Sequence, residues 1–559
     1  MHFLIGYHDK QQETLIADRF SQEGEEMPHT PEKIDKAIVT NLTALKAKYG
    51  QAGVQKIDAA VKHLIAADKK RGLITRIYPL DDAAVMGQIG GTPVTTASDP
   101  KQNKDAIDAV YKTFAPDYLL ILGAVDVIPH QDLKNPVYSP FDDPDRFAFG
   151  DLPYACEAKY SKRPQDFFGP TRVVGRLPDI TGSNDPRYLL GLLKTAATYK
   201  AMNPGLYRSY FGISAEIWRD STALSISATF GNSADLKTVP PAKANWPRIS
   251  LKRKSHFINC HGAMNDSRFY GQPASGSPDY PVALDAAYLK HKITEGTVVS
   301  AECCYGGQLF DPALNQGQAG IANSYLAGKA YGFFGSTTIA YGPSDANDQA
   351  DLICQYFLQS VLKGASLGRA ALEARQKFVH SASMSDPTNV KTIAQFNLLA
   401  DPSITPIKLP PAVPKARKRL PVLDMRVERA ERRRDLFSRG LALGKSQPII
   451  ARVSEKVAES AVTVLGKVAA DHGFTPGRTL TFSVKEPSDS KAMPRGLMAR
   501  EVFPSSVHVI FGAGKPGSVQ RGKRAMPTKT QYQKVTGTVA LIVKEVDGTI
   551  VSVKKVFSR

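Results

Sequence analysis

The stretch "TVVSAECCYGG", Thr297–Gly307, joins a short apolar run to two adjacent cysteines and a pair of glycines. β-Branched residues over so few positions predict a buried strand, and the cysteines stand where that strand ends. A cysteine at such a place is either inert packing or a nucleophile, because thiols are common in protein cores and react only as thiolates. The residues around this stretch are therefore needed to distinguish a packing cysteine from a nucleophile.

Apolar runs of the same kind recur through residues 1–410 and alternate with longer stretches whose apolar residues follow helical spacing. The predicted strands cover residues 73–80, 117–125, 171–178, 207–214, 255–260, 297–303 and 330–337. The helical stretches include residues 97–115, 186–202 and 348–364. Strands that alternate with helices predict an α/β fold with a mostly parallel sheet flanked by helices.

Two boundaries divide the chain. A polar stretch rich in Pro and Asp leads up to residue 150 and predicts two α/β subdomains, 1–150 and 151–408. The second boundary is "KLPPAVPKARKRLP", whose prolines and basic residues predict a linker over 409–421. The remaining residues, 422–559, form the last predicted unit.

That last unit is predicted as a small basic α+β domain. Stretches 424–444 and 448–473 have helical patterns, and the second of them ends at a glycine. Alternating segments follow, and Asp547-Gly548 between two of them is a strong hairpin signal.

The charged residues are distributed unevenly along the chain. Residues 411–559 carry 29 Lys and Arg against 12 Asp and Glu, whereas residues 1–410 carry 43 against 41. A basic domain on a near-neutral body predicts an anionic partner, which is nucleic acid, an acidic membrane surface or an acidic protein. The sequence lacks zinc-finger spacing, an RNP-like aromatic run and a KH loop. The alternative is a basic surface that resists aggregation.

The remaining composition predicts the cytoplasm as the compartment. No apolar run approaches the length that spans a bilayer, and "MHFLIGYHDK" does not read as a signal peptide. The five cysteines are an odd number without a disulfide framework, so reduced thiols are expected. They also lack the spacing of a zinc site, and no metal or organic cofactor is expected.

A histidine stands in the same position as the cysteine pair. His261-Gly262 follows strand 255–260 directly, as Cys303 follows strand 297–303. Ligand sites of open parallel sheets lie at the carboxyl ends of strands, so the two residues are expected to meet there. His261 would be the base for a Cys303 nucleophile, and the backbone N–H groups of Gly262 and Cys303 would face the oxyanion. Cys304 would pack beneath the site.

The order of these motifs resembles the clan CD cysteine peptidases, and gingipains most of all. Further matching stretches are "FGDLPYA" with "TRVVGRLPD", "AYGFFGSTTIAYGPSD" and "FNLLADPSITPI". The resemblance covers about residues 115–410. It implies a caspase-like fold and a cysteine endopeptidase that acts on protein substrates, with a preference for Arg or Lys before the scissile bond.

The resemblance also implies roles for three more residues. Glu216 in "GISAEIW" would orient His261, Asp220 would form the base of the substrate pocket, and Tyr341 would form an aromatic wall of it. The alternatives are a surface carboxylate for Glu216, a helix N-cap for Asp220 and ordinary packing for Tyr341.

A pocket for Arg or Lys makes self-processing a further hypothesis. The basic stretches "KARKRLP" and "ERRRD", in and after the linker, are the expected cleavage sites. Two rival functions stay open. One is a catalytically silent caspase-like scaffold, and the other is a protein that binds nucleic acid or an anionic surface through its basic domain.

Overall fold

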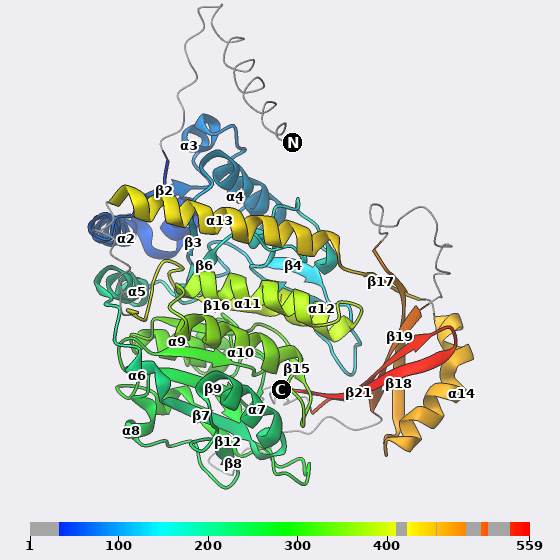
Figure 1. Cartoon of the computed structure of the whole chain (residues 1–559). Coiled ribbons are helices and arrows are strands. Elements are labelled where there is room, and N and C mark those ends of the chain that lie inside the picture. The colour runs from blue at the N-terminus through cyan, green and yellow to red at the C-terminus, as the bar shows by residue number, and fades with distance from the viewer. Residues whose placement is uncertain (1–32, 410–421, 454, 488–504, 513–536) are drawn as a thin grey trace, which may run out of the picture. The chain divides into compact units, whose positions relative to one another are not determined.

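A ten-stranded sheet carries the strands that the sequence predicts (Figure 1). The computed structural model describes residues 33–409, 422–453, 455–487, 505–512 and 537–559. In the order in which they lie side by side, the strands are β2 (Thr75–Pro79), β1 (Lys36–Thr40), β3 (Tyr118–Leu122), β6 (Val174–Leu177), β16 (Phe396–Leu399), β14 (Gly332–Ser336), β13 (Val298–Ala301), β9 (Ser255–Asn259), β7 (Tyr210–Ala215) and β8 (Lys237–Val239). All neighbours are parallel except β14 and β16.

Each of the seven predicted strands overlaps a strand of this sheet, so the predicted α/β architecture is confirmed. The other three strands, β1, β8 and β16, were not among the predicted strands. β9, β13 and β14 are buried along their whole length, as expected of parallel strands covered on both faces. The sheet is continuous across residue 150, because β3 pairs directly with β6. The polar stretch before residue 150 ends in a small hairpin of β4 (Gln131–Lys134) and β5 (Phe147–Gly150).

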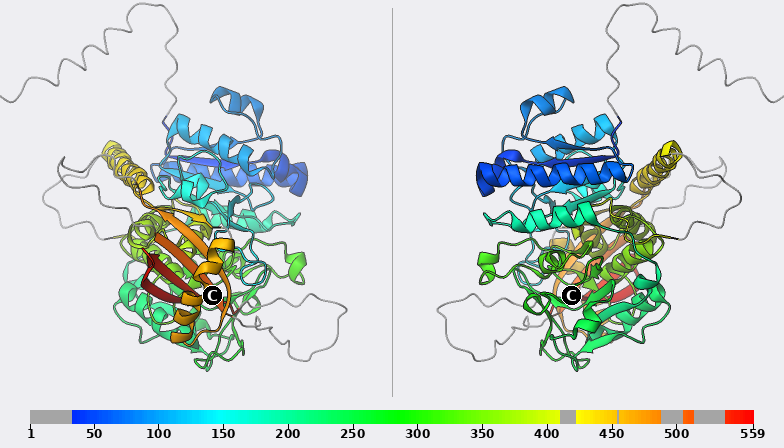
Figure 2. Two further views of the ribbon diagram at one scale, coloured as in Figure 1. Left: turned by 90° about the vertical axis from the view of Figure 1, so that its right-hand side faces the viewer. Right: turned by 90° about the vertical axis from the view of Figure 1, so that its left-hand side faces the viewer.

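Helices cover both faces of the sheet (Figure 2). Adjacent residues of β14 show this, because Phe333 contacts Tyr325 of α9 (Ile321–Ala327) and Phe334 contacts Phe357 of α10 (Gln349–Leu362). The other helices of the body are α2 (Leu42–Lys70), α3 (Ala83–Gln88), α4 (Pro100–Phe114), α5 (Arg187–Thr198), α6 (Gly205–Arg208), α7 (Arg219–Phe230), α8 (Arg248–Leu251), α11 (Leu367–Ser381) and α12 (Pro387–Gln395). Within the described ranges, no helix combines the length and apolar character needed to cross a membrane.

The C-terminal unit forms an antiparallel sheet that takes in a strand of the body. Its strands, in order, are β15 (Tyr341–Gly342), β21 (Thr549–Ser558), β20 (Val539–Val546), β19 (Ser505–Gly512), β18 (Pro476–Lys485) and β17 (Ile449–Arg452). α14 (Glu455–Asp471) packs on it, with Leu465 and Ala469 against Ile510 and Leu541. Asp547 and Gly548 both have positive φ at the turn between β20 and β21, which confirms the predicted hairpin.

The predicted helix over 448–473 is correct only from Glu455 onward. Its first residues form β17, because Ile449 and Ile450 pair with β18. A helical pattern alone cannot reveal such a pairing partner.

α13 (Val422–Lys445) carries seven of the 29 basic residues of 411–559 and lies against the body (Figure 1). Its Arg429 and Arg433 lie 3.3 and 3.0 Å from the carboxylates of Asp35 and Asp117. Part of the charge is therefore neutralised within the chain. "ERRRD" lies inside this helix and not in an exposed loop, so the structure does not present it as an accessible cleavage site. "KARKRLP" lies outside the described residues.

Candidate active site

The His-Gly and Cys-Cys motifs meet at the carboxyl ends of two neighbouring parallel strands. β9 and β13 pair in register, with Ile258 opposite Ala301. β10 (His261–Gly262) follows β9, and the cysteines follow β13. The backbones touch closely, because a Cβ added to Gly262 would lie 1.8 Å from the carbonyl oxygen of Cys304. Only glycine allows this approach.

The last residue of the sequence, Arg559, lies in this site. Its carbonyl oxygen accepts hydrogen bonds from the backbone N–H groups of Gly262 (3.4 Å) and Cys304 (3.2 Å). Its own N–H donates to the carbonyl of Ala340 at 2.9 Å. Just before it, β21 pairs with β15, Ser558 lying opposite Tyr341. Arg559 thus ends an extended segment that adds as a strand to the edge of the site.

The side chain of Arg559 fills a closed pocket. Its Nη2 donates to Asp351 Oδ2 at 2.5 Å and to the carbonyl oxygen of Pro343 at 2.7 Å, and Arg559 and Asp351 are fully buried. The guanidinium carbon lies 4.5 Å from the centroid of the Trp218 ring, at cation–π distance. The pocket therefore offers a carboxylate, a carbonyl and an aromatic face to a planar cation.

The backbone and the carboxylates of the pocket suit this occupant. A Cβ on Gly342 would lie 2.2 Å from Arg559 Nη2, so glycine makes room for the guanidinium. Asn259 donates to the other oxygen of Asp351 at 3.2 Å. Glu302 is buried beside Asp351, and burial together with that negative charge raises the pKa of Glu302 well above its ordinary value. Burial also raises the pKa of Asp351, and the charge of Arg559 opposes that rise.

Gln272 fixes the tautomer of His261. The Nε2 amide of Gln272 faces the carbonyl oxygens of Gly276 and Ser277 at 3.1 and 3.2 Å, so it must be the donor end of the side chain. Its Oε1 then accepts from His261 Nε2 at 2.8 Å. His261 Nδ1, which is buried and has no hydrogen-bond partner among the described residues, is left with a free lone pair. A free imidazole lone pair is what a general base needs.

The imidazole of His261 is also held between aromatic rings. Its centroid lies 4.3 Å from that of Trp218 and 4.9 Å from that of Tyr280. Burial lowers the pKa of His261 to about 3, against the opposing effect of the Gln272 bond. With Arg559 in place, the imidazole is therefore neutral at any physiological pH.

The two thiols point to different partners. Cys303 Sγ lies 3.9 Å from the carbonyl oxygen of Ile258 in β9, and its pKa is raised well above the ordinary value by burial. Cys304 Sγ instead receives the backbone N–H of Ala340 at 3.3 Å, on the segment that binds Arg559. Burial raises the pKa of Cys304 to about 12. Thus Cys304 Sγ, and not Cys303 Sγ, contacts Ala340, the residue that accepts the Arg559 N–H.

The residues implied by the family resemblance lie elsewhere. Glu216 accepts a bond from the backbone N–H of Ala274 at 3.1 Å, so the bond to His261 comes from Gln272 in its place. Asp220 is exposed in the first turn of α7, while the buried Asp351 contacts the guanidinium. Tyr341 is buried in β15 beside Ser558, and its hydroxyl donates to Asp143 at 2.9 Å.

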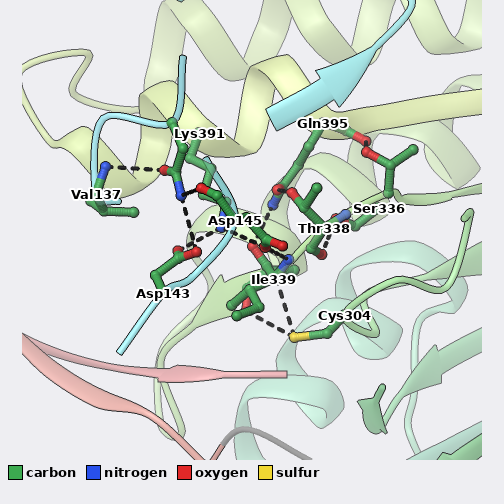
Figure 3. Close-up of polar contacts among 12 residues, drawn as sticks. Val137, Asp143, Asp145, Cys304, Ser336, Thr338, Ile339, Lys391 and Gln395 are labelled. Atoms are coloured by element: carbon green, nitrogen blue, oxygen red, sulfur yellow. Dashed lines mark hydrogen bonds and ion pairs between the residues drawn. The ribbon is translucent and has the colours of Figure 1, made fainter. Parts of the chain in front are cut away.

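A buried ionic cluster supports the segment around Ile339 and Ala340, and Ala340 accepts the N–H of Arg559 (Figure 3). Lys391 Nζ lies 2.5 Å from Asp143 Oδ2 and 3.4 Å from Asp145 Oδ2. Asp145 accepts the backbone N–H of Ile339 at 2.8 Å and the hydroxyl of Tyr305 at 2.9 Å. These bonds hold the Tyr305 side chain, next to Cys304 in the chain, and the backbone of Ile339, next to Ala340. Burial is the main cause that raises the pKa of Asp143 to about 6.

Sequence reasoning missed four contributors to this site. The stretch "FDDPD", predicted as part of a subdomain boundary, supplies Asp143 and Asp145. Gln272 lies in the Gly/Pro/Ser-rich loop after His261, whose composition does not mark one residue above the others. Asp351 sits in the first turn of α10 behind an Asp N-cap, where an acidic residue is ordinary.

No group of three or more His, Cys, Asp and Glu side chains suited to a metal ion occurs in the part of the chain that the structure describes.

Comparison with known proteins adds little. No protein-family model matches the chain, and no curated protein matches it significantly. A solved structure described as "Structure of Protease" is similar to it, with a TM-score of 0.45, 12% identity and coverage of 94% of this chain and 97% of that chain. The function therefore has to be inferred from the geometry of the site.

Proposed function

We propose that this chain is a caspase-like cysteine endopeptidase that hydrolyses the peptide bond after an arginine in an extended segment of a protein substrate. One observation carries the proposal. The carbonyl oxygen of Arg559 lies on the N–H groups of Gly262 and Cys304, while its guanidinium lies on Asp351. A residue bound in this way is held at both its reacting carbonyl and its identifying side chain.

The nucleophile of this proposal is Cys304, in place of the Cys303 expected from the sequence. Its own N–H is one of the two donors to the Arg559 carbonyl, so its side chain starts from the same residue that polarises the carbonyl. Cys303 Sγ lies by contrast against the β9 carbonyl of Ile258. Cys303 is then a packing residue under the site.

In the first half of the reaction, the free Nδ1 of His261 takes the proton of the Cys304 thiol. The thiolate attacks the arginine carbonyl carbon, and the oxyanion accepts from Gly262 and Cys304 N–H. When the C–N bond breaks, the amine leaves with the proton from the imidazolium, and a thioester remains.

In the second half, water attacks the thioester, and His261 takes its proton. The C–S bond breaks, the acid product leaves, and the proton restores the thiol. Gln272 serves as a positioning residue throughout, because its Oε1 keeps the Nε2–H in place and Nδ1 free.

Arginine fits the pocket better than lysine does. Nη2 contacts the Asp351 carboxylate and the Pro343 carbonyl together, and the planar cation lies beside the Trp218 ring. An ammonium group has no flat face to lie beside that ring. We expect lysine substrates to be cleaved more slowly and leucine substrates not at all.

The test is hydrolysis of fluorogenic peptides that carry Arg, Lys, Asp, Asn or Leu before the reporter. The proteins are the full chain, Arg559→Ala with its pocket empty, and each of these with Cys304→Ala or Cys303→Ala. Arg peptides should be cleaved, Cys304→Ala should lower the rate by about a thousandfold or more, and Cys303→Ala should retain most of it. Loss of activity in Cys303→Ala alone would overturn the choice of nucleophile. No turnover in any protein, with no labelling of Cys304 by an arginyl electrophile, would overturn the proposed function.

A further inference from the structure

We propose that residues 554–559 are a competitive inhibitor carried by the chain itself, which must leave the cleft before a protein substrate can enter. This inference rests on the proposed function, because it assigns the same cleft to the substrate and to this tail (residues 554–559). It adds that the state described here is the latent state of the protein.

The tail uses the groups that a substrate would need. The N–H donors of Gly262 and Cys304 are bonded to the Arg559 carbonyl, and the carbonyl of Ala340 is bonded to the Arg559 N–H. Asp351 is paired with the guanidinium. A second extended segment cannot bind these groups at the same time.

Lys554 anchors the same strand at a second point. Its Nζ lies 2.6 Å from Asp348 and 2.8 Å from Asp386, the N-cap residues of α10 and α12. The two carboxylates raise the pKa of Lys554 against the effect of its burial. The segment is thus held at its terminal arginine and again five residues earlier, which a chance contact of one side chain would not require.

The connection to the rest of the chain strengthens the block. β21 is hydrogen-bonded to β20 along its length, and the hairpin at Asp547-Gly548 joins the two strands. A tethered ligand competes at a high effective concentration, so even weak binding keeps the cleft closed. The nature of the group after the Arg559 carbonyl does not alter this. A carboxylate there is a reaction product, and a peptide bond there is itself the bond in line for hydrolysis.

In the occupied site, the proposed nucleophile and base are also in unreactive protonation states. The Cys304 thiol and the His261 imidazole are both neutral, since burial raises the pKa of the thiol to about 12 and lowers that of the imidazole to about 3. A thiol in this state is a poor nucleophile. The charge of Arg559 is one of the causes that lower the pKa of His261, so its departure removes that effect.

The experiment compares the full chain with Arg559→Ala and with a matched control, Lys485→Ala. Lys485 lies in β18 of the same sheet and carries the same charge, but it is exposed and outside the inhibitory segment. With an Arg reporter peptide we expect Arg559→Ala to raise kcat/KM on the order of ten- to a hundredfold and Lys485→Ala to leave it unchanged. Deletion of residues 557–559 should give at least the gain of Arg559→Ala, and thermal melting of each variant shows that it is folded.

A synthetic peptide, "VKKVFSR" (residues 553–559), supplies the second measurement. Added to Arg559→Ala, it should inhibit competitively and change the fluorescence of Trp218, whereas the peptide ending in Ala should do neither. Equal activity of the full chain and Arg559→Ala, with no effect of the peptide, would overturn the inference and leave the proposed function standing. Binding of the peptide seen by fluorescence, with no hydrolysis by any variant, would overturn the proposed function and leave the tail as a ligand of the cleft.

Discussion

The guanidinium of Arg559 and the carboxylate of Asp351 form a fully buried ion pair, 2.5 Å apart, that joins the end of β21 to the first turn of α10. Burying two charges is costly unless each finds a partner of good geometry. Asp351 meets this condition, because it also receives the Asn259 amide. Under the proposed function, this deeply buried carboxylate selects a cationic side chain.

Asp351→Asn should therefore lower kcat/KM for Arg peptides in the Arg559→Ala background by on the order of a hundredfold, because truncating one partner of a buried charge pair costs about 2–5 kcal/mol. The exposed Asp220→Asn provides the control, with an expected change of less than about twofold. Steady-state kinetics with Arg and Lys peptides measures both. A large loss in Asp220→Asn, with Asp351→Asn active, would restore the pocket implied by the sequence.

Gln272→Glu should raise the pKa of His261, since an ionised carboxylate bonded to Nε2–H favours the imidazolium. We expect a rise of about one unit or more in the Arg559→Ala background, measured by NMR of the imidazole carbon-bound protons over pH. Glu216→Gln is the control, because Glu216 bonds the Ala274 N–H and not the imidazole. A larger shift in the control than in Gln272→Glu would contradict the assignment of the positioning residue.

Lys391→Met should destabilise the fold by about 3–5 kcal/mol at neutral pH, because it leaves the carboxylates of Asp143 and Asp145 buried without their cation. Urea unfolding measures the change. Lys62→Met, which removes a pair that is 73% and 51% exposed, should cost less than about 1 kcal/mol. Equal effects of the two substitutions would mean that the buried cluster contributes no more than a surface pair.

His256 should make the protein less stable in acid. It is fully buried between the Tyr325 hydroxyl and the Arg253 carbonyl, and burial lowers its pKa from 6.5 to about 3. Between those values the unfolded chain binds a proton at this imidazole and the folded chain does not, so stability falls as the pH falls. From pH 6.5 to 5 this one group costs about 2 kcal/mol.

A comparison with His256→Gln isolates that contribution, because all other titrating groups are common to both proteins. Wild type should be the more stable at pH 6.5, and its advantage should shrink by about 2 kcal/mol at pH 5. Denaturant titrations at the two pH values provide the measurement. An advantage that stays constant or grows toward acid would refute this role of His256.

The sequence predicted the sheet well because buried parallel strands leave a local signal. Runs such as residues 255–260 and 297–303 contain aromatic or β-branched residues, and each is short enough to be a strand. The place where such a run ends then located His261 and the cysteine pair. β1, which lies between β2 and β3, was missed, and so was β17, since both depend on distant pairing partners.

The local sequence pattern could not determine which of Cys303 and Cys304 faces the site. Successive side chains near a strand point to opposite sides, so an error of one residue in the strand end exchanges the two thiols. Asp351 and Arg559 were beyond it for a different reason. Each is far along the chain from the cysteines, and no spacing rule connects Asp351, at a helix N-terminus, with Arg559 in the basic domain.

The strand pairing between β15 and β21 also limits what the cleft can accept. Its bonds involve backbone atoms of Ala340, Tyr341 and Gly342. Such bonds recognise the extended backbone of a bound segment and not its side chains. A segment in β21's place must therefore lie straight over the residues that precede its arginine. Under the proposed function, arginines within helices or compact turns should not be cleaved. Cleavage is expected in surface loops, linkers and unfolded chains.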